Sequence, residues 1–300
     1  MAQKQIFVVQ GPTASGKTAL AIALARQLQT EVISFDSRQF YTELSIGVAR
    51  PSIEELEAVR HHFIGSHSIE QALNAANFAA LAQPILSDLL QNKGSAVLVG
   101  GSALYADALL LGLDALPHDQ AIHLKWKSVF ENEGLHALQQ ALQQHDPAFF
   151  EQIDFENPAR LIRALEINEL TGQSNLALRK GPRKDPPNVV RIFINWSRAS
   201  LYKRIDARVD IMIADGLEQE ARHFFPDQAH LQALQTVGYR EFFAHFEGNL
   251  SREEAVEKMK QHTRNYAKRQ LTWLGRYDQI RALDPQKAVA AHVEHLLKIG

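Results

Sequence analysis

The chain has 300 residues, of which 45% are hydrophobic and none is cysteine, and its formal net charge is -2. This length suits one large domain or two unequal ones, and the absence of cysteine excludes disulfides, thiolate metal sites and thiol catalysis. The charge argues against a surface that binds nucleic acid over its whole extent, so any such site must be local. No run of about 18 apolar residues occurs and the first residues do not resemble a signal peptide, so we expect a cytoplasmic protein without membrane association.

The first predicted element is a strand over residues 6–10, which leads into "GPTASGKT" and a helix over residues 18–28. The spacing G-x-x-x-x-G-K-[ST] between a strand and a helix is typical of a phosphate-binding loop, because backbone N–H groups and the helix N-terminus then surround phosphate oxygens. Lys17 supplies a positive charge, and Thr18 supplies a hydroxyl for Mg²⁺. ATP is the usual partner of such a loop. The predicted phosphate-binding residues are Gly11, Pro12, Thr13, Ala14, Ser15, Gly16, Lys17 and Thr18.

The second predicted strand, residues 31–36, ends in a polar cluster formed by Asp36, Ser37 and Gln39. Open α/β folds place their active sites at the carboxyl ends of parallel strands. Asp36 can therefore bind Mg²⁺ or act as a general base. The alternative, that Asp36 only starts a turn, is less favoured beside a phosphate loop.

The next segments lack two features that would point elsewhere. His61 and His62 look like a metal pair, but adjacent residues point in different directions and no acidic residue flanks them, so we predict no zinc site. The strand over residues 96–101 ends in glycine, followed by Ser102, where a triphosphate hydrolase would carry an acid. This ending counts against ATP hydrolysis but leaves a small-molecule kinase possible.

Residues 113–187 contain no strand signal, and apolar residues recur there at helical spacing over 121–130, 135–145 and 159–170. We therefore expect a helical insertion domain over 113–187, with a core formed by 1–112 and 188–300. Strands over 189–196 and, more weakly, 279–284 complete a doubly wound parallel sheet of the P-loop NTPase type. A last helix over 251–275 begins with a capping box, Ser251 and Glu254.

The basic residues are unevenly placed. Residues 179–184 contain four of them, and residues 260–276 contain five and no acid. Arg264 and Lys268 fall on one face of the predicted last helix, and Arg269 broadens that face. An ordinary solvated helix face is the alternative.

Eight segments resemble, in order and spacing, the bacterial tRNA dimethylallyltransferases. They extend to about residue 276 and read "GPTASGKT", "EVISFDSRQFYTELSIGVARP", "RHHFI", "VLVGGSALY", "NPARLIRALEINELTG", "LYKRIDARVDIM", "LQTVGYREF" and "TRNYAKRQLTWL". The family transfers a dimethylallyl group from its diphosphate to the exocyclic amine of the adenine that follows the anticodon in tRNA. The resemblance implies that the loop holds an isoprenoid diphosphate, with Mg²⁺, in place of ATP.

The resemblance also implies catalytic roles. Asp36 would take the amine proton, while Lys17, Thr18 with Mg²⁺, and Arg208 would stabilise the departing diphosphate. Arg204 lies one helical turn before Arg208, and the alternative for this pair is a solvated face paired with Asp206 and Asp210. Ser102 occupies a place where the family usually has Thr, so the hydroxyl is kept and the methyl group is lost.

The target adenine must leave its stack to react, so the enzyme needs a pocket for the base and a surface for the anticodon stem-loop. His123 stands where the family generally has Arg. We expect a monomer, and two other functions remain open: a kinase that uses residues 179–184 as a lid, and an RNA-binding protein that uses the loop as a nucleotide switch. The resemblance implies tRNA contacts from Asp36, Ser37, Arg38, Gln39, Ser102, His123, Ala159, Arg160, Leu161, Ile162, Arg163, Arg264, Lys268 and Arg269.

Overall fold

A computed structural model describes residues 4–181 and 183–299 and divides the chain into two compact units. The helical unit is Leu113–Lys184, and the core unit comprises the residues before and after it. The predicted insertion extended three residues further, to residue 187. Asp185 belongs to the core unit, where its carboxylate accepts a 2.7 Å hydrogen bond from Arg191. Residues 1–3, part of the N-terminal segment in which we predict no signal peptide, and Pro182, within the basic residues 179–184, lie outside the described residues.

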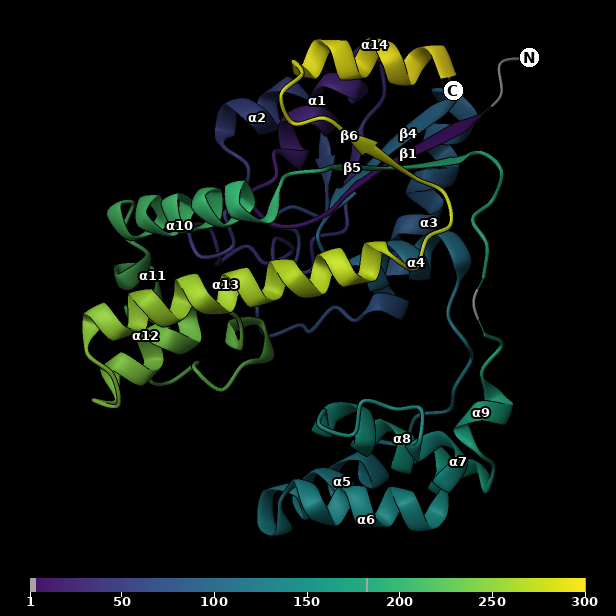
Figure 1. Ribbon diagram of the computed structural model, residues 1–300, viewed down its shortest axis with the longest axis vertical. Helices are drawn as coiled ribbons and strands as arrows, with labels where there is room; N and C mark the ends of the chain where they lie inside the picture. Colours follow the sequence, from purple (N-terminus) through teal and green to yellow (C-terminus); the bar gives the residue numbers. More distant parts are fainter. Residues whose placement is uncertain (1–3, 182, 300) are drawn as a thin grey trace. The chain divides into compact units, whose positions relative to one another are not determined.

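The core unit is built on a six-stranded sheet in the order β3-β2-β4-β1-β5-β6, and every neighbouring pair is parallel (Figure 1). Strand β1 lies between β4 and β5, so the phosphate loop that follows it starts at the middle of the sheet. The five predicted strands are confirmed as β1, β2, β4, β5 and β6. The strands are β1 Gln5–Gln10, β2 Val32–Ser34, β3 His61–His62, β4 Ser95–Gly100, β5 Val189–Ile194 and β6 Ile280–Leu283.

Strand β3 was not predicted, because two residues are too short to carry a strand pattern. His61 and His62 pair with Val32 and Ile33 of β2 and form the edge of the sheet. The imidazole of His62 lies 2.6 Å from a carboxylate oxygen of Glu31. This histidine pair therefore extends the sheet.

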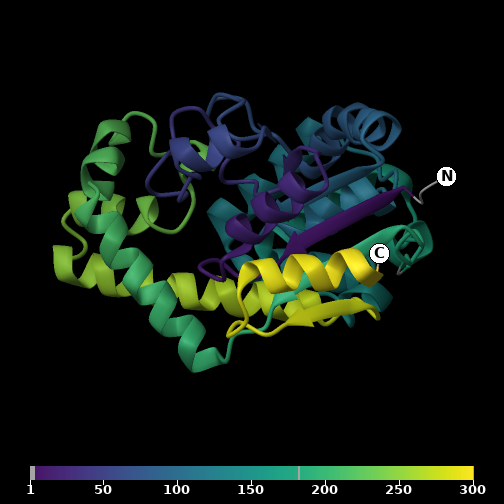
Figure 2. The same cartoon turned by 90° about the horizontal axis from the view of Figure 1, so that it is seen from above.

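Helices cover both faces of the sheet, as the doubly wound prediction requires (Figure 2). Alternate residues of β1 face opposite sides: Phe7 and Val9 pack in one core cluster, and Ile6 and Val8 pack in the other. Helices α1 (Lys17–Gln27) and α14 (Val289–Ile299) contribute to the first cluster, and α3 (Ala75–Asn92) and α4 (Ala103–Leu111) contribute to the second. A short helix, α2 (Ile53–Ala58), follows β2.

Helices from the last third of the chain pack against the phosphate loop. Leu201 and Ile205 of α10 and Ala267 of α13 form a buried cluster with Ala14 of the loop. The predicted capping box at Ser251 is present at the start of α13. These contacts bring α10 and α13 to the carboxyl edge of the sheet. The segment contains α10 (Arg198–Ala214), α11 (Leu217–Phe224), a 3-10 turn (Gln232–Leu234), α12 (Tyr239–Phe246) and α13 (Arg252–Leu274).

The helical unit has its own hydrophobic core, in which α6 supplies Leu138 and Leu142 and α8 supplies Leu161 and Leu165. Within the described ranges none of the helices of the chain is long and apolar enough to cross a membrane. The unit contains α5 (Gln120–Glu133), α6 (Leu135–His145), α7 (Pro147–Phe150), α8 (Pro158–Thr171) and α9 (Asn175–Leu178).

Candidate active site

The phosphate loop has the backbone that a ring of N–H donors requires. Gly11 and Gly16 adopt φ values of 137° and 94°, which favour glycine, and Ala14 adopts a φ of 61° between them. Helix α1 begins directly after Gly16, and no side chain caps its first turn. Its N-terminal N–H groups therefore remain available to an anion, whose charge the helix dipole also favours.

A cavity of about 640 Å³ opens on this loop, and we call it the loop cavity. Residues 14–19 line it, together with helix α10 and with Ser45, Ile46 and residues 49–51. Its lining includes four cations and two carboxylates, so the cavity suits a ligand that carries more than one negative charge. The cations are Lys17, Arg50, Arg204 and Arg208, and the acids are Glu55 and Asp215.

Lys17 is held inside the loop, where its Nζ donates a 2.6 Å hydrogen bond to the carbonyl oxygen of Pro12. Burial lowers the pKa of Lys17 to about 8; the charge of Asp36 counteracts this shift and that of Arg208 adds to it. The ammonium group is still charged at pH 7. A phosphate in the loop would supply the negative partner that this cation lacks.

The two arginines predicted on α10 both reach the site. Arg204 donates a 2.8 Å hydrogen bond to the carbonyl of Ala14, and its guanidinium lies 4.4 Å from the ring centre of Trp196. Arg208 donates to the carbonyl of Ala49 at 3.4 Å, and burial lowers its pKa. Both guanidinium groups are therefore fixed at the loop cavity.

The alternative for this pair was a solvated face paired with Asp206 and Asp210. Arg204 is indeed exposed, but the predicted ion pairs are not formed. Asp206 accepts a 2.6 Å hydrogen bond from Arg264 of α13, and Asp210 lies 2.8 Å from the ammonium of Lys260. These two carboxylates join α10 to α13 and do not pair with Arg204 or Arg208. Arg264, which we predicted to contact tRNA, is thus engaged in an ion pair within the core unit.

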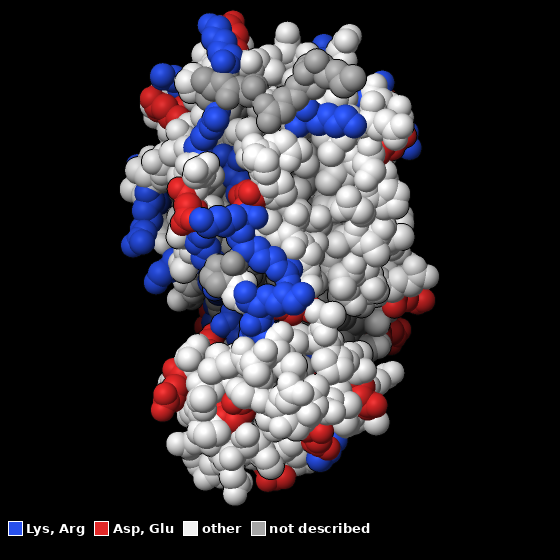
Figure 3. Space-filling model, turned by 90° about the vertical axis from the view of Figure 1, so that its right-hand side faces the viewer, with Lys and Arg blue, Asp and Glu red and all other residues white. Residues whose placement is uncertain are grey.

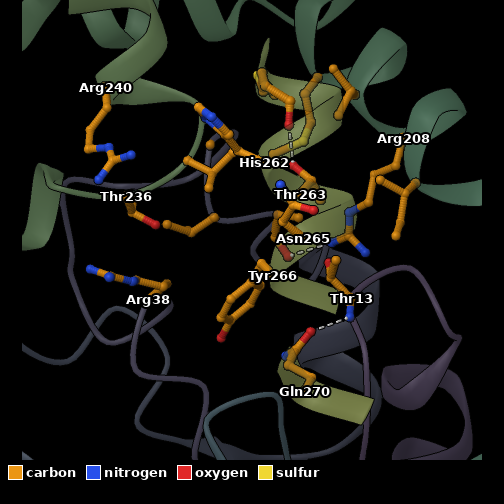
Figure 4. A pocket seen from close by; sticks show the side chains of 18 of the residues that line it. Thr13, Arg38, Arg208, Thr236, Arg240, His262, Thr263, Asn265, Tyr266 and Gln270 are labelled. Atoms are coloured by element: carbon orange, nitrogen blue, oxygen red, sulfur yellow. Dashed lines mark hydrogen bonds between the residues drawn. The ribbon is translucent and has the colours of Figure 1, made fainter. Parts of the chain in front are cut away.

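A second cavity, of about 400 Å³, lies at the end of β2, and we call it the Asp36 cavity (Figure 4). Arg38 and Arg240 lie on one side of it and Arg208 on the other, while Tyr266 projects from α13. Asp36 is the one acid among the lining residues that the structure describes. A single carboxylate among several cations suits a proton acceptor beside an anionic substrate.

The two cavities adjoin each other. Ala49, Arg208 and Met212 line both of them, so the same guanidinium faces the phosphate loop and the Asp36 side. The charge of Asp36 acts on both Lys17 and Arg208. Two substrates, one in each cavity, could therefore meet at Arg208.

Hydroxyl groups order the backbone next to Asp36. The Ser102 hydroxyl accepts a 3.1 Å hydrogen bond from the backbone N–H of Ser37 and lies 2.9 Å from the Ser37 hydroxyl. Tyr266 also reaches Ser102; burial raises the pKa of Tyr266 to about 12, and the charge of Asp36 adds to this effect. Tyr266 is therefore a protonated donor in the cavity. The sequence had placed Tyr266 in a basic helix without a role.

Gln39, predicted to line the base pocket, supports the wall of the cavity instead. Its side-chain amide donates to the carbonyl oxygens of Val48 and Ala49, at 3.2 and 2.8 Å. The same wall is held from its other end by Glu220 of α11, which the sequence gave no reason to select. The Glu220 carboxylate accepts hydrogen bonds of 2.9 to 3.1 Å from three successive N–H groups, those of Ser45, Ile46 and Gly47.

The remaining predicted residues of α13 have different surroundings. Arg269 lines the Asp36 cavity, with its guanidinium 5.8 Å from the ring centre of Tyr266, whereas Lys268 is exposed. His262 and Gln270, on the same face as Tyr266, also line the cavity and were not predicted. Periodicity alone could not separate this face from an ordinary packing face.

In the helical unit, a buried carboxylate holds two of the predicted RNA contacts. Glu166 accepts from Nδ1 of His123 at 3.2 Å and lies 2.8 Å from the guanidinium of Arg163. His123 contacts Oε2, whereas Oε1 is shared by Arg163, by His118 at 2.5 Å and by the backbone N–H of Asp119 at 2.9 Å. Burial opposes the charge, but these donors together hold the pKa of Glu166 below its ordinary value.

The prediction for residues 159–163 needs correction. Leu161 and Ile162 are buried in the core of the helical unit, so their side chains do not reach RNA. Ala159 is exposed, and Arg160 is an exposed residue 3.3 Å from Asp154. The correction follows from helical geometry, because five consecutive residues cannot share one face.

The basic residues of 179–184 also have contacts within the protein. The Arg179 guanidinium lies 4.8 Å from the ring centre of Phe149, and Arg183 donates a 2.6 Å hydrogen bond to Asp114.

Positive charge also gathers locally on the surface. Figure 3 shows a face on which Lys and Arg collect on one side and Asp and Glu are scattered. This distribution fits a near-neutral protein with local basic surfaces.

The parallel sheet, the phosphate loop and the two adjoining cavities define an α/β protein of the phosphate-loop class, with cavities whose charges suit an anionic ligand. A family model described as IPP transferase matches residues 39–277. The chain is 43% identical, over 90% of its length and 88% of the relative's, to tRNA dimethylallyltransferase 2 of Azobacteroides pseudotrichonymphae. The chain therefore belongs to the IPP transferase family, that of the bacterial tRNA dimethylallyltransferases, and is a transferase, as the resemblance predicted.

Solved structures agree with this assignment. The tRNA isopentenylpyrophosphate transferase of Bacillus halodurans is similar with a TM-score of 0.74 and 32% identity, over 99% of this chain and 95% of that one. A eukaryotic dimethylallyltransferase acting on tRNA has a TM-score of 0.77 over 94% of this chain and 74% of its own, and its 24% identity supports the fold alone. The predicted phosphate-loop fold is confirmed.

Proposed function

We propose that the protein transfers a dimethylallyl group from dimethylallyl diphosphate to the exocyclic amine of the adenosine on the 3′ side of the anticodon in tRNA. The observation that carries this proposal is the position of Arg208, which lines both the loop cavity and the Asp36 cavity. An anion held by the phosphate loop and a base held at Asp36 would have their reacting ends at this junction. We further propose that the protein acts as a monomer.

The diphosphate would occupy the loop cavity. As the bond between the allylic carbon and the diphosphate oxygen breaks, negative charge collects on the leaving group. The loop N–H groups, the Lys17 ammonium and the Arg208 guanidinium are preorganised donors for that charge. Arg204, fixed on the carbonyl of Ala14, adds a further cation at the rim.

Mg²⁺ fits this site as a partner of the substrate phosphates. Within the described residues no group of three or more histidines and acids could hold a metal by itself, whereas the Thr18 hydroxyl lines the loop cavity. Mg²⁺ is commonly bound by one or two protein ligands together with substrate phosphates and water. We assign Thr18 as the protein ligand, and the ion would neutralise part of the charge on the leaving group.

The adenine would enter the Asp36 cavity after leaving its stack in the anticodon loop. A cavity of about 400 Å³ lies within the usual range for small-ligand sites. The exocyclic amine of adenine is a weak nucleophile, because the nitrogen lone pair is delocalised into the ring. As the new carbon–nitrogen bond forms and the carbon–oxygen bond breaks, the proton passes to the Asp36 carboxylate and diphosphate departs.

The acceptor is proposed to be RNA because the lining of the Asp36 cavity is cationic. Arg38, Arg240 and Arg269 line it and could contact phosphates next to the target base. The relative from Azobacteroides is named as an enzyme of tRNA, which agrees with this assignment. The helical unit would add contacts through exposed residues such as Ala159 and Arg160.

Label transfer tests the proposal. The protein is incubated with Mg²⁺, labelled dimethylallyl diphosphate and an unmodified tRNA that has adenosine 3′ of the anticodon. The matched control is the same tRNA with guanosine at that position, and a parallel tube contains labelled ATP. We expect label in the adenosine tRNA alone. ATP consumption without label in RNA would support the kinase alternative and contradict the proposal.

A further inference from the structure

A buried side chain that the proposed chemistry does not use contacts both halves of the site. Gln270 lies on α13 and is only 8% exposed. Its carboxamide is placed between the phosphate loop and the turn that follows β4, and it lines the Asp36 cavity. A buried carboxamide must have its donors and acceptor satisfied, so its partners are informative.

The partners of Gln270 fix the orientation of its amide. The backbone N–H of Thr13, in the phosphate loop, donates to Oε1 at 3.1 Å (Figure 4). Nε2 donates to the carbonyl oxygen of Gly101 at 3.0 Å. A backbone N–H can only donate and a carbonyl can only accept, so neither bond survives a flip of the amide. One side chain therefore ties the loop to the turn that carries Ser102.

Gly101 is shaped to admit this amide. A Cβ at Gly101 would lie 2.2 Å from Nε2 of Gln270, and 3.4 Å from Oδ2 of Asp36. The φ angle of Gly101 lies outside the left-handed region, so the backbone itself would accept alanine. The glycine is needed for the space that Gln270 fills.

We propose that Gln270 is a positioning residue that sets the phosphate loop in register with the acceptor side of the site. Three elements meet at it: the loop through Thr13, the end of β4 through Gly101, and α13, which presents Tyr266 one turn earlier. The inference rests on the proposed function, because that function places the dimethylallyl donor on one side of Gln270 and the adenine acceptor on the other. Without the hydrogen bonds of Gln270, the phosphate loop and Asp36 would still be present, but the distance between them would no longer be fixed. The rate of transfer depends on that distance.

The test compares Gln270→Met with Gln261→Met. Methionine keeps the length of the side chain and removes both hydrogen bonds, and Gln261 is an exposed glutamine on the same helix. We expect Gln270→Met to lower kcat/KM for dimethylallyl diphosphate by about ten- to a hundredfold, because a buried donor and acceptor lose their partners. The dissociation constant for tRNA should stay within about threefold, and Gln261→Met should behave as the wild type.

A second readout separates positioning from packing. Dimethylallyl diphosphate with Mg²⁺ should raise the thermal midpoint of the wild type, and this rise should be smaller in Gln270→Met, because the loop binds the ligand less well. A variant with a lower midpoint but the full ligand-induced rise and wild-type kcat/KM would overturn the inference. If the wild type transfers no label at all, the proposed function fails instead, and the two failures are thus distinguishable.

A double-mutant cycle checks the contact itself. Gly101→Ala should impair transfer because its Cβ displaces the Gln270 amide. In a Gln270→Ser background, where space is free, the same change should cost several-fold less. Equal costs in both backgrounds would show that the Gly101–Gln270 contact does not hold the site.

Discussion

The cations at the cavities of the core unit and those around Glu166 in the helical unit have different partners. In the core unit, Lys17, Arg204 and Arg208 bond to backbone carbonyls at the edge of the cavities, so a ligand would be their anionic partner. In the helical unit, Arg163 and His123 contact the buried carboxylate of Glu166. A cation that lies at a cavity and forms no ion pair with an acid is prepared for an anion, whereas a cation already paired with a buried acid stabilises the fold.

This contrast predicts different consequences for substitutions in the two units. Changes of the charged residues at the two cavities should remove chemistry while folding is kept. Changes around Glu166 should alter stability and its pH dependence while chemistry is kept. Three variants, taken from the largest to the smallest expected effect on transfer, can break the contrast.

Asp36→Asn should have the largest effect. The change keeps the shape of the side chain but removes the proton acceptor, and general-base catalysis contributes about 10²- to 10⁴-fold. We expect kcat to fall by about that factor, while the dissociation constant for tRNA changes only a few-fold. Single-turnover transfer and filter binding measure the two quantities. Wild-type turnover in this variant would contradict the role of Asp36.

Lys17→Met should impair the diphosphate side and, in the absence of ligand, stabilise the protein. Burial lowers the pKa of Lys17 from 10.5 to about 8, so folding disfavours the charged form. The penalty is complete below pH 8 and disappears as the pH rises towards 10.5. Because the side chain is partly exposed, we expect a gain of roughly 1 kcal/mol in the free energy of unfolding at pH 7.

Denaturant titrations of the unliganded wild type and Lys17→Met, at pH 7 and pH 10, measure this gain. The difference in the free energy of unfolding should shrink at the higher pH. The KM for dimethylallyl diphosphate should rise at least tenfold, since a partly buried charged contact is worth about 1.5–3 kcal/mol. A destabilised variant with unchanged KM would remove Lys17 from the site.

Glu166→Gln should have the smallest effect on transfer and a clear effect on stability. The pKa of Glu166 is held below its ordinary value of 4.5, so its contribution to stability is present above that pH and is lost as the pH falls through the lower folded value. We expect the free energy of unfolding to be about 1–3 kcal/mol lower than that of the wild type at pH 7. This difference should become smaller below pH 4.5. Thermal melts over this pH range test it, and a kcat reduced as much as in Asp36→Asn would break the contrast.

Local sequence signals predicted the parts of the site that follow strands. The loop after β1 and Asp36 after β2 could be found because each motif is contiguous and adjoins a recognisable apolar run. Ser102 was found in the same way, at the end of β4. Strand β3 was too short to show a pattern, and its place depends on pairing with β2.

Residues that reach the site from distant helices could not be predicted in this way. Gln270 meets Thr13 across more than 250 positions, and Glu220 meets Ser45 across 175. Their own segments look like ordinary amphipathic helices. Leu161 was assigned to RNA for the opposite reason: a family segment was carried over whole, although helical periodicity places this residue in the core.

The structure of a complex with an anticodon stem-loop and a non-reactive analogue of dimethylallyl diphosphate tests the central claim most directly. We expect diphosphate oxygens within hydrogen-bond distance of the loop N–H groups and Lys17. We also expect the exocyclic amine of the flipped adenine about 2.6–3.2 Å from the Asp36 carboxylate. A diphosphate bound outside residues 11–18, or an adenine whose amine points away from Asp36, would contradict the claim.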